Sequence, residues 1–244
     1  LHDWFLKRHH WKTEPEWLVK TPGVVYAICT AIRALTAEGD AILIQQPVYY
    51  PFSLAIQDNK RQLINNPLVL KNGRYEIDFV DFEKKITENH VKMFILCNPH
   101  NPVGRVWSRQ ELTTMADICL AHNVTVISDE IHADFTFPGH HYTPYGTLGD
   151  QYQHNTIICT SPSKTFNIAG LQVSNIFIPD SSIRHQFQQA LNATGYDQMN
   201  TAGLIAAQAA YEGGEEWLDA LLAYLTINLD IVRKFTTECL PGVK

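Results

Sequence analysis

The chain has 244 residues, and its 19 lysine and arginine residues against 25 aspartate and glutamate residues leave a net charge of −6 at pH 7. A protein that binds nucleic acid or an anionic membrane needs a basic face to neutralise phosphates, so this charge argues against both. With 45% hydrophobic and 18% charged residues, the composition is that of a globular protein with a sizeable core, which excludes general disorder. The length suits one large domain.

The cysteines and the apolar runs limit the class of protein and the cell compartment to which the chain can belong. Five cysteines without CxxC spacing fit neither a disulfide framework nor a zinc ribbon. No apolar run is long enough to span a membrane, and no signal-peptide pattern opens the chain. We therefore expect a cytoplasmic protein. Because the sequence starts without methionine and stops just after a long helical pattern, we also expect it to be a fragment.

Helical and extended patterns alternate along the chain. Apolar residues at helical spacing run from Val25 to Leu35. Asp78 and Ser108 are placed to cap two later helices, and a leucine stripe near the C-terminus predicts a long last helix. Short buried strands are expected at residues 41–44, 91–96, 124–128, 156–160 and 173–178.

The order of these elements predicts an α/β fold. Strands that alternate with helices form right-handed βαβ units and a mainly parallel sheet. In such sheets ligands bind beyond the carboxyl ends of the strands, so the segments that follow predicted strands are the places to search for a site. Four of these segments carry unusual residues: 45–50, 98–104, 129–132 and 161–164.

Two of these segments carry opposite charges. Burial of Lys164 would lower the pKa of its amine and free it for a Schiff base with a carbonyl, although a solvated lysine in a serine-rich loop is the simpler interpretation of this motif alone. The carboxylate of Asp129 could face a cationic ring nitrogen, and at about 4 Å and an effective dielectric constant near 20 such a pair is worth roughly 4 kcal/mol. Alternatively, Asp129 caps a short helix.

Three weaker features could contribute to the same site. Asn101 could donate to a phenolate oxygen, or it could serve only the Asn-Pro turn in which it lies. Gly23 opens a helix whose free N–H groups could bind a phosphate, or it is simply a good helix start. Tyr49 could stack on a flat cofactor, although core packing is the commoner use of tyrosine.

Taken together, these residues resemble one family. The ordered phrases CNPHNPVGRVW, SDEIHADF and SPSKTFNIAGLQ are similar to those of the fold-type I, pyridoxal-phosphate-dependent enzymes of the class I/II aminotransferase superfamily. Within this superfamily they look most like the cystathionine β-lyase, or C–S lyase, branch. The resemblance runs from about Trp4 to the last helix. It implies a mainly parallel, seven-stranded sheet between helices.

The resemblance also implies a role for each candidate residue. Lys164 would hold the cofactor, pyridoxal 5'-phosphate, as a Schiff base, Asp129 would hold its pyridine nitrogen, and Asn101 its ring oxygen. Tyr49 would stack on the ring. His132 stands where many aminotransferases have a tyrosine near the ring oxygen. The phosphate would be bound by the amides of Gly23, Val24 and Val25 and by the hydroxyls of Ser161 and Ser163.

Two departures from the family pattern bear on the prediction. Gln172 stands eight residues after Lys164, where many relatives have an arginine for the phosphate and where the β-lyase branch tends to have glutamine. The small C-terminal domain, with its arginine for the substrate carboxylate, lies outside the chain. We therefore divide the chain into a cofactor-binding large domain, residues 1–215, and a long helix, residues 216–244, that leads toward the missing small domain.

The resemblance implies a C–S β-lyase that converts cystathionine-type or cysteine-type amino acids to a thiol, pyruvate and ammonia. One alternative is an aminotransferase that passes the amino group to a 2-oxo acid, and another is a non-catalytic cofactor-sensing domain of a regulator. A homodimer is expected, without a nucleic-acid or membrane partner. A metal centre and a serine hydrolase are disfavoured, because the sequence has neither metal-ligand spacing nor a G-x-S-x-G elbow.

Overall fold

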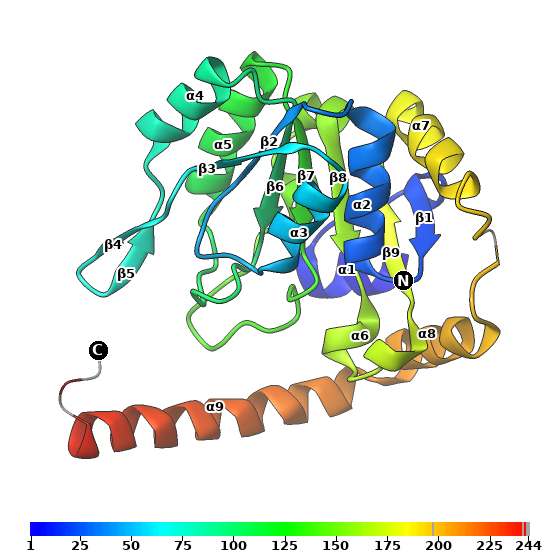
Figure 1. Cartoon of the computed structure of the whole chain (residues 1–244). Helices are drawn as coiled ribbons and strands as arrows, with labels where there is room; N and C mark the ends of the chain where they lie inside the picture. Colours follow the sequence, from blue (N-terminus) through cyan, green and yellow to red (C-terminus); the bar gives the residue numbers. More distant parts are fainter. Residues whose placement is uncertain (197, 241, 243–244) are drawn as a thin grey trace.

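The centre of the molecule is a seven-stranded sheet with the strand order β1-β9-β8-β7-β6-β2-β3 (Figure 1). A computed structural model describes residues 1–196, 198–240 and 242 of the chain. The sheet strands are β1 (Leu18–Thr21), β2 (Ala41–Ile44), β3 (Gln62–Asn65), β6 (Met93–Cys97), β7 (Thr125–Asp129), β8 (Thr156–Thr160) and β9 (Ser174–Phe177). A separate hairpin is formed by β4 (Val69–Lys71) and β5 (Arg74–Glu76).

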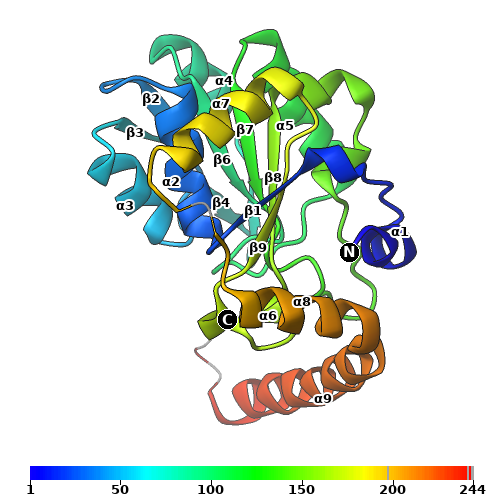
Figure 2. The same cartoon turned by 90° about the vertical axis from the view of Figure 1, so that its right-hand side faces the viewer.

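Helices cover both faces of the sheet (Figures 1 and 2). One face carries α2 (Val24–Leu35), α3 (Pro51–Asp58) and α7 (Ser181–Asn192), and the other carries α4 (Phe79–Glu88) and α5 (Arg109–Ala121). Beyond the carboxyl ends of the parallel strands lie α6 (Pro162–Thr165), α8 (Thr201–Gly213) and α9 (Glu215–Cys239), while α1 (His2–His9) lies beside the sheet, near the start of α9.

The core is split by the sheet into two apolar layers. Strand β2 shows how the sequence builds them, because Ile42 and Ile44 pack with α2 and α3, whereas Leu43 packs with α4 and α5 on the other face. Consecutive side chains of a strand point to opposite faces, so a strand that is covered on both sides is apolar throughout. All four residues of β2 are accordingly buried.

Strand direction sets where a site can form. Strands β8, β7, β6, β2 and β3 are parallel, whereas β9 is antiparallel to β8, and β1 is antiparallel to β9. The amino end of β9 therefore lies at the same edge of the sheet as the carboxyl ends of the parallel strands. Among the described residues, no helix combines the length and apolar character that a membrane span requires.

The predicted α/β fold with a mainly parallel sheet is confirmed. All five predicted strands are present within two residues of their expected bounds, and α9 covers most of the long helix expected at residues 216–244. Residues 241, 243 and 244 of that range lie outside the described residues. Strands β1 and β3 were not expected, because a four-residue, partly polar edge strand leaves a weak pattern. The division into two domains stays a prediction.

Candidate active site

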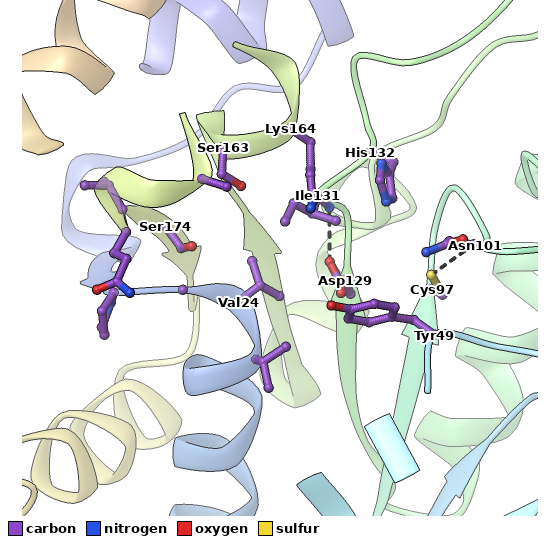
Figure 3. A pocket seen from close by; sticks show the side chains of 16 residues that line it. Val24, Tyr49, Cys97, Asn101, Asp129, Ile131, His132, Ser163, Lys164 and Ser174 are labelled. Atoms are coloured by element: carbon purple, nitrogen blue, oxygen red, sulfur yellow. Dashed lines mark hydrogen bonds between the residues drawn. The ribbon is translucent and has the colours of Figure 1, made fainter. Parts of the chain in front are cut away.

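A cavity of about 250 Å³ opens at the carboxyl ends of the parallel strands (Figure 3). Nine of the ten predicted site residues line it, and only Ser161 does not. They come from the start of α2, the segment before α3, the loop after β6, the end of β7 and α6. The cavity is lined by Pro22, Gly23, Val24, Val25, Tyr49, Cys97, Asn101, Asp129, Ile131, His132, Ser163, Lys164, Ala169, Gln172, Val173 and Ser174.

Lys164 lies in α6, a helix of four residues that directly follows β8. Its side chain extends toward Asp129 within the cavity (Figure 3). Of the two interpretations of this motif, a buried and a solvated lysine, the second describes Lys164 in this chain, because the residue is exposed. The physical reason is that α6 lies at the open rim of the cavity, where the described residues do not cover the lysine.

Asp129 is the last residue of β7, and its side chain points into the cavity (Figure 3). It is 4% exposed, and the backbone N–H of Ile131 donates to its Oδ1 at 3.1 Å. Within residues 1–196, 198–240 and 242, no salt bridge pairs Asp129 with a basic side chain. Burial raises the pKa of Asp129 to about 7, against the opposing effects of the Ile131 hydrogen bond and the charge of Lys164.

The two interpretations of Asp129 are therefore compatible. One carboxylate oxygen accepts from the turn that follows β7, as a capping residue would, and the carboxylate still faces the cavity. A buried carboxylate without an ion pair is costly, and a cation in the cavity would lower that cost. The arrangement fits a ligand with a positive charge at this end.

The opposite end of the cavity is formed by the start of α2. No side chain caps this helix, so its first N–H groups face the cavity without an intrahelical partner. A Cβ added to Gly23 would meet nothing within 4 Å, so there is open space directly in front of the helix. Free amides and the positive end of the helix dipole favour an anion in that space.

Two hydroxyls add to this end of the cavity. Ser163 lies in α6, and Ser174 is the first residue of β9 (Figure 3). In the described part of the chain, neither side-chain hydroxyl makes a hydrogen bond. Gln172, which stands where many relatives have arginine, also lines this end. The anion would thus meet amides and hydroxyls, which are neutral donors.

Ser161 does not contribute its hydroxyl to the cavity. Its Oγ donates to the carbonyl of Val173 at 2.7 Å and accepts from the N–H of Ser163 at 3.1 Å. It is the N-cap of α6 and is 5% exposed. Both hydrogen bonds are made within the protein, and the contact of this hydroxyl with a phosphate stays a prediction.

The remaining predicted residues surround the space between the two ends. Tyr49, half-exposed, lies near Asp129, and Asn101 lies beside Cys97, whose Sγ accepts from the Asn101 N–H at 3.4 Å (Figure 3). Burial and, to a smaller extent, the charge of Lys164 lower the pKa of His132. This shift favours the neutral imidazole, which can donate one hydrogen bond and accept another.

Sequence reasoning missed Ser174 and Cys97. Ser174 begins a strand, and the search covered only the segments that follow strands. Because β9 is antiparallel to β8, its first residue reaches the same edge as the ends of the parallel strands. Cys97 ends β6 and precedes the Asn98–Gly104 segment, so the motif could have indicated it. Burial, and the charge of Asp129, raise the pKa of its thiol.

Comparisons with known proteins identify the family. The family model for aminotransferase class I and II matches residues 1–238. The chain belongs to this family. It is 45% identical over 241 residues to cystathionine beta-lyase PatB of Bacillus subtilis (strain 168), covering 99% of this chain and 62% of that protein.

Solved structures agree with this assignment. Cystalysin from Treponema denticola, whose crystal structure contains pyridoxal 5'-phosphate, matches with a TM-score of 0.97 and 39% identity over 100% of this chain and 62% of that one. The C–S lyase from Staphylococcus hominis, solved with bound pyridoxal phosphate, matches with a TM-score of 0.93 and 37% identity, covering 98% and 61% of the two chains. The predicted family and its fold-type I architecture are confirmed.

The chain spans about 62% of the length of the relatives that it matches. The described residues include the seven-stranded sheet, its helices and the cavity at its edge.

Proposed function

We propose that this protein binds pyridoxal 5'-phosphate through Lys164 and acts as a carbon–sulfur β-lyase on small amino acids of the cystathionine or cysteine type. The observation that carries the proposal is the cavity itself. It contains an amine that can form a Schiff base, a buried carboxylate without an ion pair, and a helix start with open space in front of its amides.

The residues of the cavity fit this cofactor at both of its polar ends. Asp129 would hold the pyridine nitrogen, whose positive charge would compensate the buried carboxylate. The amides at the start of α2, with the hydroxyls of Ser163 and Ser174, would hold the phosphate. Tyr49 would lie against the ring, and Asn101 and His132 would be neighbours of its oxygen. Ser161 would act indirectly, as the cap of α6.

The residues would share the chemistry as follows. When bound, pyridoxal phosphate supplies an electron sink for the charge that develops at the substrate's Cα. The Lys164 amine would serve as the base that removes the proton from Cα. Asp129, as a carboxylate, would keep the ring nitrogen protonated. With a thiolate leaving group on Cβ, the substrate and water yield a thiol, pyruvate and ammonia.

A homodimer in the cytoplasm completes the proposal. Lys164 is exposed, and Tyr50, whose ring centroid lies 5.8 Å from that of the cavity-lining Tyr49, is 71% exposed. Large uncovered apolar groups beside a binding site are typical of a surface that another chain covers. The division at residue 215, with α9 leading to a further domain, belongs to the same proposal.

The first test is whether the cofactor becomes covalently attached to Lys164. Incubation with pyridoxal phosphate followed by borohydride should attach one cofactor per chain irreversibly, and peptide mapping should place it on Lys164. Lys164→Ala should lose this labelling completely, whereas Lys92→Ala, which removes a lysine remote from the cavity, should keep it. Labelling spread over several lysines, with no loss in Lys164→Ala, would contradict the proposal.

The second part of the test separates the three possible activities. The complete protein is incubated with cystathionine alone and, separately, with an amino donor and a 2-oxo acid. Pyruvate and a thiol formed without the oxo acid support the lyase. Amino transfer without thiol release supports the aminotransferase instead. Bound cofactor without turnover in either reaction would point to a cofactor-sensing domain.

A further inference from the structure

The backbone around Lys164 is held by its neighbours. Lys164 is exposed, but Ser161 and Thr165, at the two ends of the same short helix, are 5% and 1% exposed. Ser161 anchors the start of α6 to the carbonyl of Val173. A helix of four residues has little stability of its own, so its direction depends on such anchors.

The anchor at the other end is Asp134. The Thr165 hydroxyl donates to Asp134 Oδ2 at 2.7 Å, and the Asp134 side chain is only 8% exposed. Asp134 lies in the loop after β7, five residues beyond Asp129. The hydrogen bond therefore links the helix that carries the lysine to the segment that carries Asp129 and His132.

The second oxygen of Asp134 is held by α1. Oδ1 accepts from His9 Nε2 at 2.9 Å and from the Trp4 indole N–H at 3.3 Å, and Arg8 Nε lies 3.9 Å away. The Trp4 ring also packs against Phe166, the residue after Thr165, with ring centroids 5.5 Å apart. Both Asp134 and the end of α6 thus rest on the N-terminal helix.

The same helix is tied to α9. Arg8 donates to Asp219 at 3.0 Å and lies 3.5 Å from Glu215, which also pairs with Lys7. In Figure 2, α1 lies above the start of α9. A continuous set of contacts therefore runs from α9 through α1 and Asp134 to Thr165, next to the lysine.

From these contacts we infer that Asp134 is a positioning residue for Lys164, a role that rests on the proposed function. By accepting from Thr165, it sets the direction from which the amine reaches the cavity, and it makes that direction depend on the docking of α1. Asp134 itself does not line the cavity of Lys164. Its effect is transmitted through the backbone of α6.

The test exchanges the Thr165 hydroxyl for a methyl group. Thr165→Val keeps the shape of the side chain but cannot donate to Asp134, whereas Thr165→Ser restores the donor. Thr87→Val makes the same exchange at an exposed helical site and serves as the control. For each protein we would measure the dissociation constant of pyridoxal phosphate, the visible circular dichroism per bound cofactor, and the melting temperature without cofactor.

Thr165→Val should bind the cofactor about tenfold more weakly, which corresponds to about 1.4 kcal/mol, the scale of one hydrogen bond to a charged group. Its dichroism per bound cofactor should fall, because the chromophore is held less uniformly. Thr165→Ser and Thr87→Val should match the wild type in both measurements. Equal values for Thr165→Val and Thr165→Ser would overturn the proposal. A large drop in the melting temperature of cofactor-free Thr165→Val would also overturn it, because the weaker binding would then reflect a general loss of stability.

A second variant covers the case in which Thr165→Val does not fold. Trp4→Phe keeps an aromatic ring against Phe166 but removes one donor to Asp134, so it should weaken cofactor binding in the same direction by a smaller factor. Unchanged binding in Trp4→Phe would then overturn the proposal. If borohydride fails to label Lys164 in the wild type, the proposed function fails and this role with it. Labelling of the wild type without a difference among the variants refutes only the role of Asp134.

Discussion

Asp129 and Glu130 are consecutive buried carboxyl groups that the structure treats in opposite ways. Burial raises the pKa of each to about 7. Glu130 accepts hydrogen bonds from the Ser128 hydroxyl, the Tyr142 hydroxyl and the Tyr145 N–H. Asp129 accepts one hydrogen bond, from Ile131, and faces the cavity.

The difference follows from where each side chain points. Neighbouring residues at the end of a strand project to opposite sides, so Asp129 reaches the cavity while Glu130 reaches the loop at residues 142–145. The protein supplies the Glu130 carboxyl group with three donors, as a buried polar group requires, and supplies Asp129 with one. The Asp129 carboxyl group therefore keeps more of its hydrogen-bond capacity for the cavity that it faces. We therefore propose that Glu130 serves stability and Asp129 serves binding, and three substitutions test this comparison.

The largest effect is expected from Glu130→Ala. This change would leave three donors without an acceptor and create a cavity beside Tyr145, which is 1% exposed. We expect a loss of about 3–5 kcal/mol in the free energy of unfolding. Urea denaturation measures it, and Glu130→Gln, which keeps the volume and one acceptor, should lose less. A loss below about 1 kcal/mol in Glu130→Ala would remove the structural role.

Asp129→Asn is expected to raise the free energy of unfolding of the cofactor-free protein, the opposite of the effect of Glu130→Ala. Burial raises the pKa of Asp129 from 3.8 to about 7, so the folded state favours the protonated carboxyl group. The contribution of this group to the free energy of unfolding is therefore fully present below about pH 4 and is lost as the pH rises through 7. The amide does not ionise. Asp129→Asn should therefore match the wild type near pH 4 and exceed it by roughly 2–4 kcal/mol above pH 7.

Urea denaturation at several pH values measures this difference, and Asp58→Asn, at an exposed helical position, is the control. The same Asp129→Asn protein should bind pyridoxal phosphate more weakly, because the ring nitrogen loses its anionic partner. A stability difference that is constant with pH would show that Asp129 does not titrate in this range. Unimpaired cofactor binding would show that it does not hold the ring.

The smallest effect is expected from Tyr142→Phe. It removes one of the three hydrogen bonds to Glu130 and leaves the other two in place. We expect a loss of about 1–2 kcal/mol in the free energy of unfolding and unchanged cofactor binding. Tyr224→Phe, whose side chain is 61% exposed and does not line the cavity, should change neither quantity. Weaker cofactor binding in Tyr142→Phe would contradict the division of roles between the two carboxyl groups.

Much of the site could be predicted from sequence, because the rule for parallel sheets depends only on the order of elements. Strands β6, β7 and β8 end next to one another, so Asn101, Asp129 and Lys164 had to approach the same edge. The helix start at Gly23 joined them because α2 packs against the sheet with its first turn at that edge. The positions of Asn101, Asp129 and Lys164 follow from chain order and apolar pattern, whereas that of Gly23 depends on how α2 packs.

Other features depended on contacts between distant segments. The hydroxyl of Ser161 could have bound a ligand, but it bonds to the carbonyl of Val173. Ser174 lines the cavity only because β9 is antiparallel to β8. The residues of a strand do not by themselves determine its direction relative to its neighbours. The link from Thr165 to Asp134 and on to α1 joins residues more than 100 positions apart.

The sequence by itself determined that Asn101, Asp129 and Lys164 stand at the edge of the sheet, because the hydrophobic period and the order of strands and helices can be read along the chain. Only the tertiary structure decided which of those groups remain available to a ligand. The hydrogen-bond capacity of a side chain is limited, so a hydroxyl or carboxylate that makes several hydrogen bonds inside the fold has little left for a ligand. Asp129 and Ser163 stayed open to the cavity, whereas Glu130 and Ser161 were taken up by the protein.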